Sequence, residues 1–329
     1  MAKAAIVILN YNGEETLNKF LPSVIEYSDF PVYVADNASS DNSIDLLEEN
    51  FPQVRLISLN QNYGFAGGYN EALSSIQGKY TYYILLNSDV EVTAGWDQQL
   101  ISYLEVDKRL AGVQPKILSF ERKEYFEHAG AGGGFIDGFG YPYCRGRVFD
   151  TIEKDKGQYD DELLVDWVSG ACMAVRADLF HESGGFESSF FAHMEEIDWC
   201  WRARCQGYQF KYYGKVKVYH VGGATLARSN PRKTYLNFRN NLSTLKRNLT
   251  KATWFRIYFA RIFFDLLAAI VFLIRGGQEH AKMVFKAHKD FRKGRNLDFS
   301  DRKECKRNGK IQLLLWEYYI RGRKKYADF

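Results

Sequence analysis

The sequence predicts an α/β fold in which a mostly parallel central sheet is flanked by helices and followed by an α-helical C-terminal region. Through the first 90 residues, short runs of β-branched and aromatic residues alternate with stretches of helical periodicity. This alternation predicts parallel strands, because each helix returns the chain to the same edge of the sheet. The 329 residues are 46% hydrophobic and 26% charged, which excludes a disordered chain.

The first half of the chain supplies the sheet and its helices. Residues 4–10 are apolar almost throughout, which predicts a strand buried on both faces. Apolar side chains at helical spacing predict a helix over residues 14–27, and Asp41 or Ser40 is a suitable N-cap for the next helix. The other predicted elements of this half are strands at 32–36, 54–59 and 80–86 and helices at 41–49 and 66–76.

The middle of the chain has a different character. Residues 119–163 show little periodicity and contain a glycine-rich run at 129–134, so we interpret them as a mobile excursion over the site. Regular structure is predicted to resume at 165–176. It continues with helices at 199–205 and 235–249 and a strand at 210–219.

The formal net charge of +4 combines two unlike parts. Residues 275–329 contain 16 Lys and Arg against 7 Asp and Glu, which leaves 28 basic and 33 acidic residues in the rest of the chain. We therefore predict an α/β domain of residues 1–230 and a helical, basic C-terminal region of residues 231–329. The two parts are expected to meet different partners.

The C-terminal region has the composition of helices that lie on a membrane. Residues 254–274 are strongly apolar but contain Arg261 and Asp265, and the longest clean run, 266–274, is well short of the roughly 20 residues that span a bilayer. Residues 279–293 place lysines largely away from an apolar side. We interpret both stretches as interfacial helices on an anionic membrane surface. A spanning helix and an ordinary helical subdomain are the alternatives.

The two remaining compositional signals concern the compartment. The N-terminus enters the first predicted strand directly after Lys3 and has no small-residue cleavage site, so no signal peptide is expected. The five cysteines include no C-x-x-C pair, which argues against a disulfide scaffold and a structural zinc site. These features predict a cytoplasmic, reducing location.

Each of the first four predicted strands ends in a polar loop. Ligands of parallel α/β sheets bind beyond the carboxyl ends of the strands, so four such loops at one edge predict a binding site there. The alternative for any single loop is the ordinary preference of loops for turn residues. The loops are Asn10-Tyr11-Asn12-Gly13, Asp36-Asn37-Ala38-Ser39, Asn60-Gln61-Asn62-Tyr63-Gly64 and Asn87-Ser88-Asp89.

Asn87 and Asp89 are candidates for holding a divalent cation against a diphosphate. Residues two apart in an extended segment face the same side, and hard cations prefer oxygen ligands that they share with phosphates. His220 follows a later predicted strand and is a candidate metal or phosphate ligand. The alternatives are that Asn-Ser-Asp is only a turn and that the lone histidine is structural.

Two further features suit a nucleotide. Asp36 ends the second strand, where its carboxylate can accept a hydrogen bond from a nucleobase N–H; a helix cap is the alternative. Glycines at 64 and 67 open the third helix, where backbone N–H groups can approach a phosphate. No G-x-G-x-x-G motif follows the first strand, which disfavours a nicotinamide enzyme.

Glu195, Glu196 and Asp198 form a dense acidic cluster at the start of a predicted helix. The helix dipole explains part of this acidity, but three carboxylates beside Phe190 and Trp199 exceed what it requires. A carboxylate near apolar rings can have a raised pKa and act as a general base.

In their order along the chain, these motifs resemble family 2 glycosyltransferases, and more closely the rhamnosyltransferase-like branch. The similarity covers about residues 4–225. It includes the strand-end loops and the segments 62–70, 169–176, 184–187 and 190–200. The resemblance implies a GT-A fold for residues 1–230 and an inverting transfer from a nucleotide-diphosphate sugar.

The resemblance also implies a role for each candidate residue. Asp36 contacts the base, and Glu196 is the catalytic base, with Glu195 and Asp198 as alternatives. The family's D-x-D-type metal motif corresponds to Asn87, Ser88 and Asp89, where Asn87 replaces the first Asp, so Asp89 and Asn87 are the implied ligands of Mg²⁺ or Mn²⁺, and His220 is the candidate third ligand from its strand-end position. The implied nucleotide-sugar-binding residues are Asn10, Tyr11, Asn12, Asp36, Asn62, Gly64, Gly67 and Asn87. Arg228 and Arg239 are further candidates for phosphate contacts.

The function that follows is metal-dependent hexosyl transfer to a saccharide or lipid-linked saccharide, in cell-surface polysaccharide synthesis at the inner face of the membrane. Thymidine-diphosphate rhamnose is favoured as donor only by the branch resemblance, and no nucleic acid partner is predicted. A nucleotidyltransferase is one alternative, although the first strand-end loop lacks the basic residue that a triphosphate would need. A non-catalytic sugar-binding module, or a nucleic-acid-binding module using the basic tail, is another.

Overall fold

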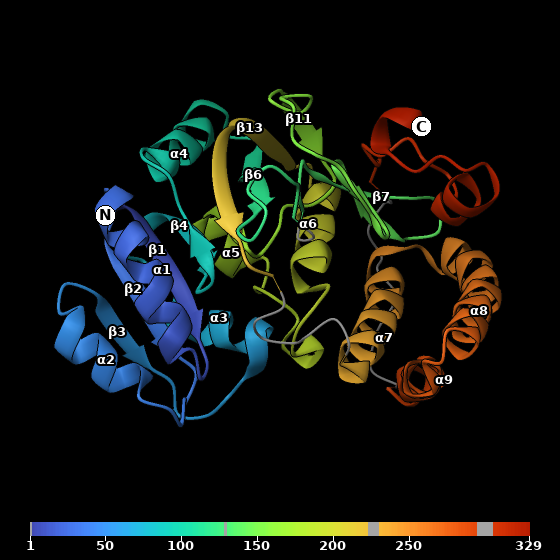
Figure 1. The fold of residues 1–329 in the computed structure, drawn as a ribbon, viewed down its shortest axis with the longest axis horizontal. Coiled ribbons are helices and arrows are strands. Elements are labelled where there is room, and N and C mark those ends of the chain that lie inside the picture. Colours follow the sequence, from blue (N-terminus) through green and yellow to red (C-terminus); the bar gives the residue numbers. More distant parts are fainter. Residues whose placement is uncertain (1, 128–129, 223–229, 295–304) are drawn as a thin grey trace.

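The computed structural model describes residues 2–127, 130–222, 230–294 and 305–329 (Figure 1). Within them, nine strands form the central sheet, in the order β11-β13-β6-β12-β4-β1-β2-β3 with β5 paired to β13. The strands are β1 (Ala2–Asn10), β2 (Val32–Asp36), β3 (Arg55–Ser58), β4 (Tyr80–Asn87), β5 (Val90–Glu91), β6 (Leu110–Ser119), β11 (Glu162–Val165), β12 (Cys172–Arg176) and β13 (Gln209–His220).

The predicted α/β fold is confirmed. Strands β3, β2, β1 and β4 are parallel, as is the pair β6 and β13. Strand β12 runs antiparallel between β4 and β6, and β11 and β5 pair antiparallel with β13. The parallel strands therefore end at one edge of the sheet, where the polar loops follow them.

Six helices precede the C-terminal region within the described residues, and they cover both faces of the sheet. They are α1 (Glu14–Tyr27), α2 (Ser43–Asn50), α3 (Gly64–Ser75), α4 (Trp96–Val106), α5 (Ala177–Glu182) and α6 (Glu195–Cys205). Alternate side chains of β1 face opposite sides, as an extended strand requires. Ala4, Ile6 and Ile8 join the core with α1, α2 and α4, whereas Ala5 and Val7 join the core with α3, α5 and α6.

The segment 119–163 is not the loose excursion that the sequence predicted. It contains an antiparallel sheet of β7 (Gly134–Ile136), β8 (Pro142–Cys144), β9 (Arg147–Val148) and β10 (Thr151–Ile152). The prediction was wrong because it attributed the glycines to mobility. At Gly134, a Cβ atom would lie 2.3 Å from the Trp167 ring, so the glycine permits close packing.

The C-terminal region is helical, as predicted. It contains α7 (Pro231–Asn248), α8 (Lys251–Ile274), α9 (Gln278–Lys293) and the short turns η2 (Trp316–Ile320) and η3 (Tyr326–Asp328). In Figure 1, α7, α8 and α9 lie together beside the sheet, and the C-terminus lies near β7. The domain boundary near residue 230 stays a prediction.

Residues 305–329 form an integral part of the core. The Tyr326 ring stacks 5.4 Å from that of Phe135, which lies in β7. Asp137 accepts a hydrogen bond from the Leu314 N–H at 2.9 Å, and the two carboxylate oxygens of Asp166 accept from the backbone N–H groups of residues 308 and 309. This part of the basic tail therefore packs against the small sheet and its connecting loops.

Candidate active site

The ends of β1 and β2 are joined by side chains. Asn10 is paired in register with Asp36, and its Nδ2 donates to the Asp36 Oδ1 at 3.0 Å. The other Asp36 oxygen accepts from the Ser39 N–H at 2.9 Å, and Asp36 is only 1% exposed. Asn12 accepts a hydrogen bond from the backbone of Ser40 at 2.7 Å, while Tyr11 is 46% exposed. Asp36 thus fixes both loops, and the Tyr11 ring lies at the surface beside them.

The loop before α3 is built around two asparagines. The Asn62 Oδ1 accepts from the N–H of Gly64 at 2.8 Å and from the Asn37 Nδ2 at 3.1 Å. Gly64 has φ +72°, and a Cβ atom there would lie 2.5 Å from the Phe191 ring. At Gly67 a Cβ atom would lie 2.9 Å from the Cβ of Tyr63. The glycines therefore allow the start of α3 to pack closely, and Asn37 is an organising residue that the sequence analysis did not single out.

The structure brings the three predicted metal ligands together. The His220 Nε2 lies 3.1 Å from the Asp89 Oδ1 and 3.2 Å from the Asn87 Nδ2. His220 ends β13, which pairs with β5 just after Asp89, so the sheet itself sets this arrangement. A carboxylate, an amide oxygen and a neutral imidazole are ligands of the kind that Mn²⁺ or Mg²⁺ sites use, so these three side chains are the candidate set for such a cation, which His220 would join only in its neutral form.

Glu127 is a fourth member of this cluster, and sequence reasoning missed it. Its Oε2 lies 3.1 Å from the His220 Nδ1, which leaves Nε2 facing Asp89. Burial lowers the pKa of His220, but the Asp89 and Glu127 carboxylates outweigh burial and raise it to about 10. Within the described parts of the chain, no group of three or more His, Cys, Asp and Glu side chains has metal-binding geometry, so the candidate site depends on Asn87.

Glu195, which is buried, and Glu196, which is half-buried, form an acid pair at the first turn of α6. The Oε2 atom of each is buried without a hydrogen-bond partner. Burial, together with the charge of Glu196, raises the pKa of Glu195 well above its ordinary value. Burial also raises the pKa of Glu196, to about 7, although hydrogen bonds from backbone N–H groups and from Glu195 oppose this. Burial therefore favours the neutral, protonated form of both carboxyl groups.

The structure places Asp198 differently from its neighbours. Its carboxylate accepts from the Arg202 Nε at 2.8 Å, the Asn248 Nδ2 at 2.8 Å and the Arg247 Nε at 3.2 Å. These partners occupy both oxygens and link α6 to α7. Asp198 is therefore engaged in the core, away from the acid pair.

Arg239 and Arg228 were the two arginines predicted to contact phosphates, and the structure describes only the first of them. The Arg239 Nη2 donates to the carbonyl oxygens of Ser189 and Phe190, at 2.7 Å and 3.1 Å. Arg239 thus holds a loop, and the structure gives it no place among the strand-end residues that were predicted to bind the nucleotide. Arg228 lies outside the described residues.

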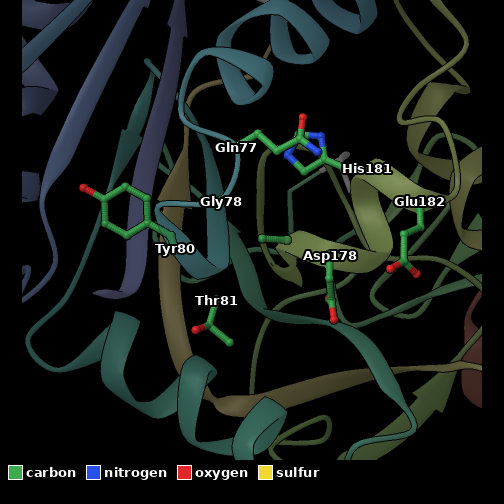
Figure 2. A pocket seen from close by; sticks show the side chains of 8 residues that line it. Gln77, Gly78, Tyr80, Thr81, Asp178, His181 and Glu182 are labelled. Carbon is green, nitrogen blue, oxygen red and sulfur yellow. The ribbon is translucent and has the colours of Figure 1, made fainter. Parts of the chain in front are cut away.

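A pocket of about 470 Å³ lies elsewhere, at the amino end of β4 (Figure 2). The candidate site lies at the carboxyl end of that strand, so the two occupy opposite edges of the sheet. The pocket is lined by Gln77, Gly78, Tyr80, Thr81, Ala177, Asp178, His181 and Glu182. None of the predicted site residues is among them.

Comparison with known families decides the assignment. Residues 5–182 match the model of the family described as glycosyl transferase family 2. The chain belongs to that family. The glycosyltransferase motif residues from Asn10 to Asp89 lie inside the matched range. His220 and the acid pair lie beyond it, so their assignment depends on the geometry.

Relatives support the resemblance to the rhamnosyltransferase-like branch. The glycosyltransferase is 25% identical over 231 residues to an N-acetylglucosaminyl-diphospho-decaprenol L-rhamnosyltransferase of Mycobacterium tuberculosis, covering 65% of this chain and 75% of the relative. It is 25% identical over 222 residues to rhamnosyltransferase WbbL of Escherichia coli, covering 66% and 81%. The family assignment favours sugar transfer over the nucleotidyltransferase alternative.

A solved structure confirms the GT-A fold of the glycosyltransferase. The crystal structure of GalNAc-T7 with UDP, GalNAc and Mn²⁺ superposes with a TM-score of 0.59 at 12% identity. The alignment covers 98% of this chain and 57% of that one. At this identity the likeness establishes the fold alone.

Proposed function

We propose that this family 2 glycosyltransferase transfers a sugar, rhamnose from its thymidine-diphosphate donor, to a hydroxyl of a lipid-linked saccharide. The names of the two rhamnosyltransferase relatives support rhamnose as the transferred sugar, and the name of the first also supports a lipid-linked acceptor. The observation that carries the proposal is the acid pair. Its loop lies against the start of α3, because the Phe191 carbonyl accepts from the Phe65 N–H at 2.6 Å.

In the proposed reaction, Glu196 removes the proton of the acceptor hydroxyl. The freed oxygen forms a bond to the anomeric carbon as the bond from that carbon to the diphosphate oxygen breaks. The leaving nucleoside diphosphate keeps the electron pair, and attack from the opposite face inverts the anomeric configuration. Glu195 precedes Glu196 in the first turn of α6, and its carboxyl group is a titratable neighbour that influences the pKa of Glu196.

Asp89, Asn87 and His220 would hold a divalent cation beside the diphosphate. When bound, such a cation supplies positive charge that stabilises the leaving group. Asp36 and Tyr11 would contact the nucleoside, and the Asn62–Gly64 turn would place backbone N–H groups near the phosphates.

The first test is to screen the purified full chain for nucleoside-diphosphate release across a panel of nucleotide sugars, with lipid-linked saccharides as acceptors. Release from thymidine-diphosphate rhamnose that depends on acceptor and Mn²⁺ is expected. A chain that binds a nucleotide sugar but releases no product would instead be the non-catalytic module.

We expect Glu127→Gln to weaken Mn²⁺ binding. The substitution keeps the shape but removes the charge that orients His220, and losses of such supporting carboxylates typically cost about 10–100-fold in metal affinity or activity. Mn²⁺ affinity can be measured by electron paramagnetic resonance titration. Glu124→Gln is the matched control in the same segment, and equal affinity for both variants would argue against the proposed site.

The proposed location is the inner face of the membrane, with α8 as the contact. Among the described residues, α8 is the helix that is both long enough and apolar enough to cross a bilayer, judged by length and composition alone. From Phe259 to Ile274, however, every exposed side chain is apolar and both charged side chains are buried. These are Arg261 and Asp265, and Asp265 pairs with the His288 Nε2 at 2.8 Å.

This arrangement favours an α8 that lies in the membrane plane. Its inner face is fixed by Arg261, which donates to Asn241 of α7, and by Asp265, which accepts from the Tyr141 hydroxyl at 3.1 Å. Crossing the bilayer would carry both charges into hydrocarbon. Exposed basic side chains of α9 would add attraction to anionic lipid: Lys282, Lys286, Lys289, Arg292 and Lys293.

We expect the protein to sediment with phosphatidylglycerol-containing vesicles, less so at high salt, and poorly with pure phosphatidylcholine. The double variant Phe259→Glu and Phe263→Glu should remain in the supernatant, because it places charges in the apolar face of α8. Val106→Glu is the control, since Val106 is exposed at the end of α4. Vesicle binding that survives the double variant would refute this surface; a concentration-dependent dimer without vesicle binding would assign it to a second copy.

A further inference from the structure

The loop that leads into the acid pair has an uncommon backbone. Residues 190–194 connect the turn η1 (Ser188–Phe190) to α6. Phe191, His193 and Met194 have φ values of 64°, 71° and 75°, a region that side chains other than glycine seldom enter. Such a backbone persists only where its surroundings hold it in place.

Asn240 of α7 is the side chain that holds this loop. It is fully buried, and its Nδ2 lies 3.0 Å, 2.9 Å and 2.7 Å from the carbonyl oxygens of Phe190, Ala192 and His193. Its Oδ1 accepts from the Arg239 Nε at 2.8 Å. One amide group therefore contacts three backbone carbonyl oxygens of the loop.

The loop connects the two halves of the candidate active site. At one end, the Phe191 carbonyl accepts from the N–H groups of Phe65 and Ala66, in the first turn of α3. At the other end, Met194 is the N-cap of α6 and Glu195 follows directly. A change in the path of the loop would therefore move the acid pair relative to the nucleotide-binding loop.

We propose that Asn240 is a positioning residue, which acts through the loop 190–194 to hold Glu195 and Glu196 against the donor site. This inference rests on the proposed function, in which Glu196 accepts the proton of the acceptor. Asn240 itself need not touch the substrate.

A pH profile separates positioning from mere support of the fold. Burial is the first cause of the raised pKa of Glu196, so an opened loop would admit water and return that pKa toward its ordinary value. The other titratable groups that interact electrostatically with Glu196 are Glu195, Cys144 of β8 and Cys200 of α6. Burial raises the pKa of both thiols, so they stay neutral in the range of interest.

The test uses Asn240→Asp in the full chain. This isosteric change replaces the donor group by an acceptor beside three carbonyl oxygens. We expect kcat for nucleoside-diphosphate release to fall about 100-fold, as misplacement of a catalytic group commonly causes, with little change in KM for the donor. We also expect the acid limb of the kcat profile to move from about 7 toward the ordinary glutamate value near 4.3.

Two further variants make the result interpretable. Arg239→Gln removes contacts to the same loop from a less buried position, and should give a smaller effect of the same kind if Asn240→Asp fails to fold. Asn237→Asp is the matched control, because the Asn237 Nδ2 donates to the Lys233 carbonyl within α7. It should behave as the wild type.

Hydrogen–deuterium exchange provides a measurement that needs no substrate. The amides of residues 190–196 should lose protection in Asn240→Asp while those of β1 and β4 keep theirs. Wild-type kcat with an unchanged acid limb, or unchanged protection of the loop, would overturn the inference. If the wild type releases no nucleoside diphosphate from any donor, the proposed function fails instead, and exchange alone decides whether Asn240 holds the loop.

Discussion

Replacement of Glu196 by Gln is expected to abolish sugar transfer while nucleotide binding survives. The amide keeps the size of the side chain but cannot accept the acceptor proton, and loss of a general base typically costs about 10²–10⁴-fold in rate. Initial rates of nucleoside-diphosphate release and calorimetric titration with the nucleoside diphosphate measure the two properties separately.

Two companion measurements sharpen this prediction. Glu182→Gln, at the opposite edge of the sheet, should leave the rate unchanged (Figure 2). In the wild type, kcat should fall as pH drops through about 7, because protonation of Glu196 removes the base. Full turnover by Glu196→Gln would rule out Glu196, whereas an inactive Glu195→Gln with an active Glu196→Gln would transfer the role to Glu195.

Replacement of Asp198 by Asn is expected to cost about 3–5 kcal/mol of unfolding free energy, the range found when one partner of a buried ion pair is removed. Asp198 is fully buried between Arg202 and Arg247, and the substitution leaves the buried Arg202 guanidinium without its countercharge, whereas Arg247 keeps its pairing with Glu187. Urea unfolding followed by circular dichroism measures the loss.

The exposed Asp178→Asn, on α5, should change stability little and serves as the control. The outcome also assigns the third carboxylate of the acidic cluster. A stable but inactive Asp198→Asn would return Asp198 to the candidate bases, whereas the expected unfolding identifies it as a residue that joins α6 to α7.

The strands of the parallel sheet were predictable because their apolar runs end abruptly in polar loops. β6 and α4 were not predicted. β6 contains Gly112, Gln114 and Lys116, which break its apolar pattern. Lys116 is nevertheless fully buried, because it pairs with the Asp155 carboxylate at 2.9 Å. A partner 39 residues away satisfies this charge, and no local pattern in the sequence reveals it.

Some residues of the candidate site could likewise be predicted from the sequence, and others could not. Asn87 and Asp89 directly follow a predicted strand, so their place at the edge of the sheet could be inferred, and the acid pair was recognisable because its carboxylates stand at the start of a predicted helix. Glu127 could not, because it lies in a segment whose glycines resembled a loop. Asn240 could not either, since its role depends on how α7 packs beside α6.

The attachment of residues 305–329 to the small sheet has a consequence for biosynthesis. The hydrogen bond from the Leu314 N–H to the Asp137 carboxylate cannot form until Leu314 has been synthesised, 177 residues after Asp137. A ribosome that adds about 5–20 residues per second needs roughly 9–35 s for this stretch. Until then Phe135 and Tyr143 lack the Tyr326 ring that covers them. The nascent enzyme therefore exposes these aromatic rings until residues 314–326 emerge, and a chain cut short before Leu314 would keep them open to chaperones and proteases.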